Sequence, residues 1–278
     1  MHSYQPFKCR RGFLSPQYQS ESRVQEMRVS LLYRYWHLQT QTLQKCWKCI
    51  KRSLQNKLIK KQRSLKIIQI DPLNPSYDKI LEAHRIIKNG GVIMFPTQHL
   101  YGLGAEALNI KAVDKVFEMK QRAYNKPLLV LIHEQKDLTK LVQKIPSTAI
   151  RIMECFWPGG LTIVFKAKKV LPANLTAGTD RIGVRMPQHP VARALAKALK
   201  SPVTATSANI TGNSGCSQIS DLDPLIADRL DLILDAGPLK GGIGSTVVDV
   251  THDFPKILRE GAIPAKDIFA VLGGRDTG

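Results

Sequence analysis

Residues 92–132, VIMFPTQHLYGLGAEALNIKAVDKVFEMKQRAYNKPLLVLI, hold the pattern from which the fold of this chain is predicted. The apolar run 92–95 predicts a buried strand, residues 98–108 predict a glycine-punctuated turn, and the apolar spacing over 111–119 predicts a helix. A second apolar run, 128–132, predicts another strand. Strands mixed with helices in this way are typical of an α/β sheet that helices cover.

A short cationic turn joins the predicted helix to the second strand. Lys120, Arg122 and Lys126 stand at positions i, i+2 and i+6, and Pro127 favours an extended backbone at the residue before it. Three positive charges on one turn repel one another unless an anion lies among them. Spacing alone favours a solvated basic loop, with an anion site as the alternative.

The remainder of the chain from residue 66 continues the same mixture of elements. Strands are predicted over 66–70, 161–165, 182–186, 203–206, 232–234, 246–250 and 256–258. Helices are predicted over 76–89, with Ser76 as its N-cap, 136–143, 147–156, 189–199 and 264–272. Because strands and helices do not alternate strictly, the sequence predicts an α/β fold on an open mixed sheet flanked by helices.

The positive charge is concentrated in the first 64 residues. They contain 14 Lys and Arg against two Glu, a net charge of +12, whereas the other 214 residues contain 27 against 20, a net charge of +7. We expect residues 1–64 to be a basic extension without a fold of its own and residues 65–278 to be a compact domain. The extension is interpreted as an RNA- or membrane-surface arm, an organelle-targeting leader, or a product of a start codon placed too early.

Cysteine usage and hydropathy indicate where the chain works. Five cysteines spread over 278 residues do not form a secreted disulfide pattern, which favours a reducing compartment and a cytoplasmic location. Cys46 and Cys49 form a C-x-x-C pair, but no second pair stands nearby, so a zinc site is not expected. No apolar run is long enough to span a bilayer, and no signal-peptide core is recognisable.

Several common catalytic patterns are absent from the sequence. There is no G-x-x-x-x-G-K-[ST] phosphate loop, no G-x-S-x-G nucleophile motif and no histidine spacing typical of a metal site. An enzyme of this composition would therefore act by positioning and electrostatics, with a substrate group as the nucleophile. Phosphoryl and nucleotidyl transfer work in this way.

Seven motifs follow one another along the globular part. They are P-T-x-x-x-Y-G-L (96–103), K-x-R-x-x-x-K-P-L (120–128), W-P-G-x-L-T (157–162), V-R-M-P-x-H-P (184–190), S-A-N-x-T-G (207–212), S-T-V-V-D (245–249) and L-R-x-G (258–261). In this order and spacing, over about residues 66–272, they resemble the short, single-domain form of the YrdC family, whose members are threonylcarbamoyl-AMP synthases.

The resemblance implies a twisted open mixed sheet around a deep basic cavity that binds ATP, L-threonine and bicarbonate, with Mg²⁺ accompanying the ATP. Threonine and bicarbonate would form N-carboxythreonine, whose carboxylate attacks the α-phosphorus and releases pyrophosphate. The threonylcarbamoyl-adenylate would pass to a separate transferase complex that modifies adenosine 37 of tRNA. No metal-binding residue is implied.

The resemblance also assigns roles to residues of this chain. It places the signature catalytic quartet on Lys120, Arg122, Ser207 and Asn209. It implies ATP contacts from Arg122, Lys126, Thr162, Ser207 and Arg259. It implies threonine-side contacts from His99, Tyr101, Lys166 and Ser245. Many relatives have Glu-Thr or Glu-Ala where this chain has Gln98-His99.

Two other classes of function are kept as alternatives. The first is a non-catalytic RNA-binding protein that holds tRNA or double-stranded RNA with its basic cavity and N-terminal arm. Aromatic residues make up only 6% of the chain, so an array of aromatics for base stacking is not expected. The second is a hydrogenase-maturation module, which normally sits in a much longer chain with zinc-finger and acylphosphatase parts.

Overall fold

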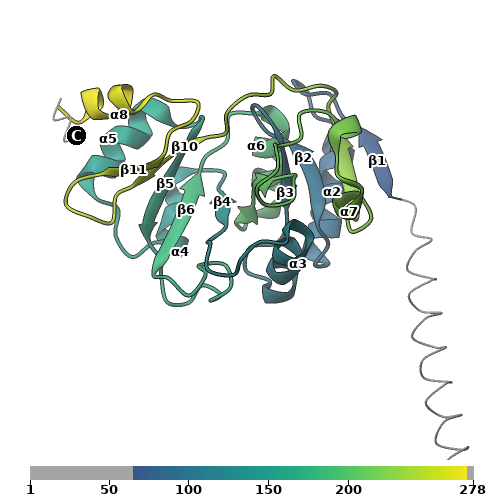
Figure 1. Cartoon of the computed structure of the whole chain (residues 1–278), viewed down its shortest axis with the longest axis horizontal. Coiled ribbons are helices and arrows are strands. Elements are labelled where there is room, and N and C mark those ends of the chain that lie inside the picture. The colour runs from purple at the N-terminus through teal and green to yellow at the C-terminus, as the bar shows by residue number, and fades with distance from the viewer. Residues whose placement is uncertain (1–64, 274–278) are drawn as a thin grey trace, which may run out of the picture. The chain divides into compact units, whose positions relative to one another are not determined.

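The computed structural model describes residues 65–273, and the N-terminal extension predicted over residues 1–64 lies outside this range (Figure 1). Two mixed β-sheets carry the fold. The first has the order β1-β9-β2-β3-β8, with bounds Lys66–Gln69, Leu232–Asp235, Ile93–Pro96, Tyr101–Gly104 and Thr206–Ser207. The second has the order β11-β10-β5-β6-β4-β7, with bounds Lys256–Arg259, Thr246–Asp249, Leu161–Lys166, Arg181–Arg185, Leu129–Leu131 and Val203–Thr204.

Helices cover both faces of the first sheet. Ile93 and Phe95 of β2 pack in one core cluster with helices α2 (Tyr77–Lys88) and α6 (Pro190–Leu199). The side chain between them, Met94, belongs to the other core cluster, with α3 (Ile110–Lys120) and α7 (Pro224–Ala227). Because successive strand residues point to opposite faces, a fully apolar strand such as β2 requires cover on both sides.

The second sheet has one apolar face and one face that is open to a pocket. Leu161, Ile163 and Phe165 of β5 pack in the core with α5 (Ser147–Phe156), beside which α8 (Ala265–Val271) lies in Figure 1. The alternate residues Thr162 and Val164 line the pocket. A short helix, α4 (Leu138–Leu141), follows β4.

The α/β class and mixed pairing are confirmed, but some predicted elements were wrong. Residues 98–108 are not only a turn, because β3 lies within them and pairs with β2. Its Y-G-L-G pattern has no apolar run, yet Gly104 is needed there, since a Cβ atom would stand 2.7 Å from the Phe95 ring. The predicted strand 203–206 is divided at Ala205 between β7 of one sheet and β8 of the other.

Smaller differences concern helix ends. Ser76 precedes α2, but its side chain makes no capping hydrogen bond. The helix predicted over 136–143 is a 3₁₀ turn at Gln135–Asp137 followed by one turn of α-helix, α4. Helix α3 is capped at its N-terminus by Asn109, whose side chain accepts a hydrogen bond from the Ala112 amide, and at its C-terminus by Gln121, which adopts a left-handed conformation (φ 48°). Because α3 ends at Lys120, the cationic turn that follows lies beside the pocket.

Candidate active site

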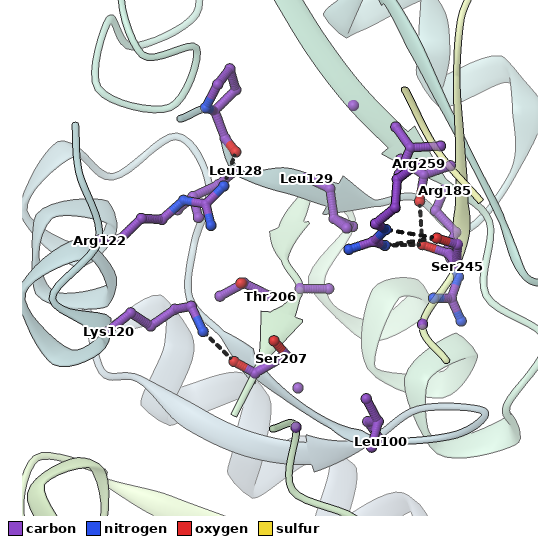
Figure 2. Close-up of a pocket in the computed structure, with 18 of the residues that line it drawn as sticks. Leu100, Lys120, Arg122, Leu128, Leu129, Arg185, Thr206, Ser207, Ser245 and Arg259 are labelled. Atoms are coloured by element: carbon purple, nitrogen blue, oxygen red, sulfur yellow. Dashed lines mark hydrogen bonds between the residues drawn. The ribbon is translucent and has the colours of Figure 1, made fainter. Parts of the chain in front are cut away.

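A pocket of about 630 Å³ lies between the two sheets, and residues of both line it. Its lining residues include five cations: Lys120, Arg122, Arg181, Arg185 and Arg259. None of the described residues that line it is Asp or Glu. Figure 2 shows Lys120 and Arg122 on one wall and Arg185, Ser245 and Arg259 on the opposite wall. This charge distribution suits a ligand with several negative charges.

Lys120, the last residue of α3, is almost fully buried and acts as a bridge between α3 and the segment after β8. Its Nζ donates hydrogen bonds to the backbone oxygens of Ser207 and Asn209, both at 2.6 Å, and to Asn209 Oδ1 at 3.0 Å. An ammonium group has three N–H donors, so these acceptors use its full capacity. Lys120 therefore holds the Ser207–Asn209 backbone in place and contributes charge to the same wall.

The ionisation of Lys120 depends on its surroundings. Burial, and next the positive charge of Arg122, lower the pKa of Lys120 to about 7. A bound anion would favour the ammonium form and raise this pKa again. Binding of an anion and protonation of Lys120 are therefore expected to be linked.

The family resemblance implies that the anion is ATP, and we expect the affinity for it to fall as the pH rises between about 7.5 and 9, by up to about tenfold per pH unit. In this range the phosphates of ATP no longer titrate, since the second phosphate pKa is about 6, whereas free protein loses the Lys120 charge. Calorimetric titrations at several pH values measure the effect, with Lys120→Met as the reference. An affinity that does not change with pH in the wild-type chain would contradict the linkage.

Arg122 and Lys126 share one turn but point differently. Arg122 Nε donates to the Lys126 backbone oxygen at 2.9 Å, and Nη2 donates to the Pro127 oxygen at 2.8 Å. Arg122 lines the pocket, while the Lys126 side chain is exposed and does not. The backbone of Lys126 thus orients Arg122. Burial, followed by the charge of Arg259, lowers the pKa of Arg122, so the pocket's cations repel one another.

Ser207 and Asn209 form a small hydrogen-bonded unit directly after the chain crosses between the sheets. The Ser207 hydroxyl donates to Asn209 Oδ1, and Asn209 Nδ2 donates to the backbone oxygens of Ile210 (2.9 Å) and Asn213 (2.6 Å). Both residues line the pocket. Lys120, Ser207 and Asn209 therefore form one hydrogen-bonded unit, and Arg122 lines the same pocket. The catalytic role of this predicted quartet stays a prediction.

The opposite wall is built around Ser245. Arg259 donates from Nε and Nη2 to the Ser245 backbone oxygen at 3.2 and 2.7 Å, and the Ser245 hydroxyl is 2.9 Å from Thr162 Oγ1. The contact between Arg259 and Ser245 is possible because Gly261 has no side chain. A Cβ atom there would stand 2.3 Å from the Gly244 oxygen. The glycine of the L-R-x-G motif thus lets Arg259 approach Ser245.

Two arginines in the pocket, Arg181 and Arg185, have no role assigned by the family resemblance, although the sequence offers Arg185 as a phosphate ligand or a structural ion-pair partner. Arg185 is buried and donates from Nε to the Gly159 oxygen at 3.0 Å, and no described carboxylate pairs with it. Burial, and next the charge of Arg259, lower its pKa to about 10. Arg181 lines the pocket two residues before Gly183. The R-I-G-V-R pattern of β6 could have indicated that Arg181 and Arg185 lie together, because strand residues i and i+4 share a face.

The remaining predicted residues lie in different places. Tyr101 lines the pocket, but its hydroxyl donates to the Gly237 oxygen (2.7 Å) and accepts from the Ala236 amide (3.0 Å). Burial raises the pKa of Tyr101 to about 12.

Lys166 is exposed at the end of β5 and does not line the pocket. His99 lines a second cavity of about 760 Å³, together with Gln98 and Cys155. The predicted substrate contacts of His99 and Lys166 stay predictions.

Taken together, the elements define an α/β protein with a cation-lined pocket between two mixed sheets. The chain belongs to the Sua5/YciO/YrdC family, because the family's sequence model, which carries the description telomere recombination, matches residues 85–261. The putative threonylcarbamoyl-AMP synthase of Methanocaldococcus jannaschii is 35% identical over 205 residues, which are 73% of this chain and 96% of that protein.

Two further comparisons involve Pyrococcus abyssi. Its threonylcarbamoyl-AMP synthase is 37% identical over 195 residues, which are 70% of this chain and 57% of that protein. The crystal structure of P. abyssi Sua5 complexed with L-threonine aligns with a TM-score of 0.70 and 36% identity, over 74% of this chain and 61% of that one. The chain thus spans less than two thirds of the length of these relatives.

The structure also bears on membranes and metals. Within residues 65–273, no helix combines the length and the apolar character needed to cross a membrane. In the same range, His, Cys, Asp and Glu side chains do not gather in groups of three that could hold a metal ion. The structure shows five cations that line the pocket. That the whole cavity is deep and basic stays a prediction.

Proposed function

We propose that this chain is a threonylcarbamoyl-AMP synthase, a nucleotidyltransferase that converts ATP, L-threonine and bicarbonate to threonylcarbamoyl-adenylate and pyrophosphate. The observation that carries the proposal is the pocket, in which five cations and no described carboxylate face one space of about 630 Å³. Such a volume is within the usual range for small-molecule sites. Family membership and the name of the M. jannaschii relative support this choice over other anion-binding functions.

The reaction needs fixed positive charge more than a protein nucleophile. The amine of threonine and bicarbonate form a carbamate with loss of water. A carbamate oxygen then bonds to the α-phosphorus, the bond to the bridging oxygen of the β-phosphate breaks, and its electron pair leaves with pyrophosphate. Arg122, Arg259 and Lys120 would stabilise charge on the phosphate oxygens, and Ser207 and Asn209 would hydrogen-bond to them.

Mg²⁺ would enter with the nucleotide. The lining residues offer hydroxyl and amide oxygens, including those of Thr162, Ser207 and Asn209, and no described carboxylate. Because the described lining offers no carboxylate, the ion would be held by its own waters and by the phosphate oxygens of the nucleotide. The ion would neutralise part of the phosphate charge, while the protein supplies the surrounding cations.

The product is an activated acyl-adenylate, so we propose that a separate transferase passes its threonylcarbamoyl group to adenosine 37 of tRNA. Residues 65–278 would hold the catalytic domain. A chain that begins at residue 65 is therefore the natural comparison with the full chain in every assay described below.

A pyrophosphate-release assay tests the function. With ATP, Mg²⁺, threonine and bicarbonate, we expect pyrophosphate to accumulate with one adenylate formed per pyrophosphate, and omission of threonine to stop it. Serine is the matched substrate control, because it lacks only the methyl group of threonine. Absence of pyrophosphate, together with RNA binding that weakens steeply with salt, would instead support the RNA-binding alternative.

A further inference from the structure

Arg181, which lines the pocket, forms an ion pair with the buried carboxylate of Asp249, to which the proposed reaction assigns no role. Arg181 lies on β6 and Asp249 on β10, with β5 between these strands. Arg181 Nη1 donates to Asp249 Oδ2 at 2.8 Å, so the arginine side chain crosses β5 to reach its partner. On β5, Val164 pairs with Gly183 of β6 on one side and with Asp249 of β10 on the other.

Asp249 has no exposed surface, and both of its oxygens are engaged. Oδ1 accepts a hydrogen bond from the Thr251 amide at 2.8 Å, while Oδ2 binds Arg181 and lies 3.8 Å from His252 Nε2. A buried carboxylate is costly unless it is paired. Asp249 therefore holds the guanidinium of Arg181 in one place, and Arg181 stands between this carboxylate and the pocket.

The strand registers divide the pocket's arginines between two ends. Arg181 and Arg185 are four residues apart on β6, about 13 Å at the usual rise per residue. Arg122 binds the Pro127 oxygen, and Leu129, two residues after Pro127, pairs in parallel with Gly183. Extending this register places Pro127 level with Arg181. Arg181 thus lies level with Pro127, whose oxygen Arg122 binds, and Arg185 lies at the other end of the strand.

The Arg181 end is the more open and carries further cations at its rim. The Arg181 side chain is 40% exposed, and Lys166, its register partner on β5, is exposed beside it. Lys126, next to Arg122, is exposed too. A leaving group with several negative charges would bind these cations and leave the pocket at this end.

We infer that Asp249 is a positioning residue that holds Arg181 as a ligand for the β- and γ-phosphates of ATP, which leave as pyrophosphate. This inference rests on the proposed function. When the bond between the α-phosphorus and the bridging oxygen breaks, the electron pair stays on the pyrophosphate. A guanidinium fixed at that end by Asp249 stabilises the growing charge.

Direct binding of inorganic pyrophosphate and of AMP, measured by calorimetry with Mg²⁺ on the full chain, tests the inference without turnover. Arg181→Ala is expected to weaken pyrophosphate binding on the order of tenfold to a hundredfold, the usual loss for a charged hydrogen bond. AMP binding should change less than about twofold, because AMP lacks the β- and γ-phosphates. Equal losses for both ligands would overturn the assignment of Arg181 to this end.

A double-mutant cycle isolates the part played by Asp249. Asp249→Asn should weaken pyrophosphate binding in the wild-type background but cause no further loss in the Arg181→Ala background. Losses that multiply would show that Asp249 acts independently of Arg181 and would refute the positioning role. A further loss in the double variant relative to Arg181→Ala refutes the positioning role even where Asp249→Asn alone does not fold.

Asp180 offers a matched control. Its carboxylate lies 4.0 Å from Arg181 Nε but is 68% exposed, so Asp180→Asn should leave pyrophosphate binding within about twofold of wild type. The pyrophosphate-release assay separates the two proposals. Turnover by the wild-type chain, with unchanged pyrophosphate binding in Arg181→Ala, would refute this inference but not the proposed function. A wild-type chain without turnover would refute the proposed function, whatever the outcome of the binding cycle.

Discussion

Replacing Lys120 with methionine is expected to lower the rate of pyrophosphate release by on the order of a hundredfold or more. The substitution removes a positive charge from the pocket that Arg122, Ser207 and Asn209 also line. It also removes the donor that fixes the backbone of Ser207 and Asn209, whose side chains would contact the phosphates. Charge and geometry are lost together, so a single substitution affects the whole quartet.

The same change should lower the free energy of unfolding by on the order of 3 kcal/mol, because three acceptors of a nearly fully buried group lose their donor. Urea unfolding and steady-state kinetics on one preparation measure both effects. Lys115→Met is the matched control, since Lys115 lies on the same helix and its Nζ binds the Gly90 oxygen (2.6 Å) outside the pocket. Undiminished turnover in Lys120→Met would contradict the site assignment.

Gly261→Ala is expected to reduce turnover on the order of a hundredfold without removing any polar group. The new Cβ atom would stand 2.3 Å from the Gly244 oxygen and 2.6 Å from the Ser245 carbonyl carbon. Backbone atoms cannot rotate away, so β11 must separate from the segment before β10. Arg259, two residues earlier, would then lose its contact with the Ser245 oxygen.

Overpacking of this kind typically costs about 1–3 kcal/mol of stability. Thermal unfolding and the KM for ATP, compared with those of Arg259→Ala, show whether the loss acts through Arg259. Gly178→Ala serves as the control, because Gly178 has φ +69° with no atom within 4 Å of a Cβ and does not line the pocket. It should lose about 1 kcal/mol through backbone strain and keep its activity. A fully active Gly261→Ala chain would disprove the close packing of this motif.

Much of the fold was predictable because its main elements have strong local signals. The apolar spacing of 111–119 and the pattern of 147–156 predicted α3 and α5 to within a residue or two. The glycine-containing strand β3 was missed, since Tyr101–Gly104 carries no apolar run. Its place is determined by pairing with β2 and by the Phe95 ring, which only a glycine at position 104 can accept.

The candidate site was predictable in part for a similar reason. The order of the motifs identified Arg122, Ser207, Asn209 and Arg259, and the structure brings all four to one pocket. It did not show that the side chain of Lys120 would turn to two backbone oxygens, or that Arg181 would cross a strand to Asp249. Such contacts join residues 68 to 89 positions apart, and no local pattern encodes them.

The sequence by itself therefore determined the family, most helices and strands, and the cationic turn that ends in Lys126 and Pro127. Only the tertiary structure decided that Lys120 and Arg122 of this turn line a pocket, while Lys126 is exposed to solvent. The physical reason is the crossing at Ala205, where the chain leaves one sheet and enters the other and carries Ser207 and Asn209 to the Lys120 ammonium. Sheet pairing between distant segments creates that juxtaposition, and it gathers five cations that are scattered over 140 residues of sequence.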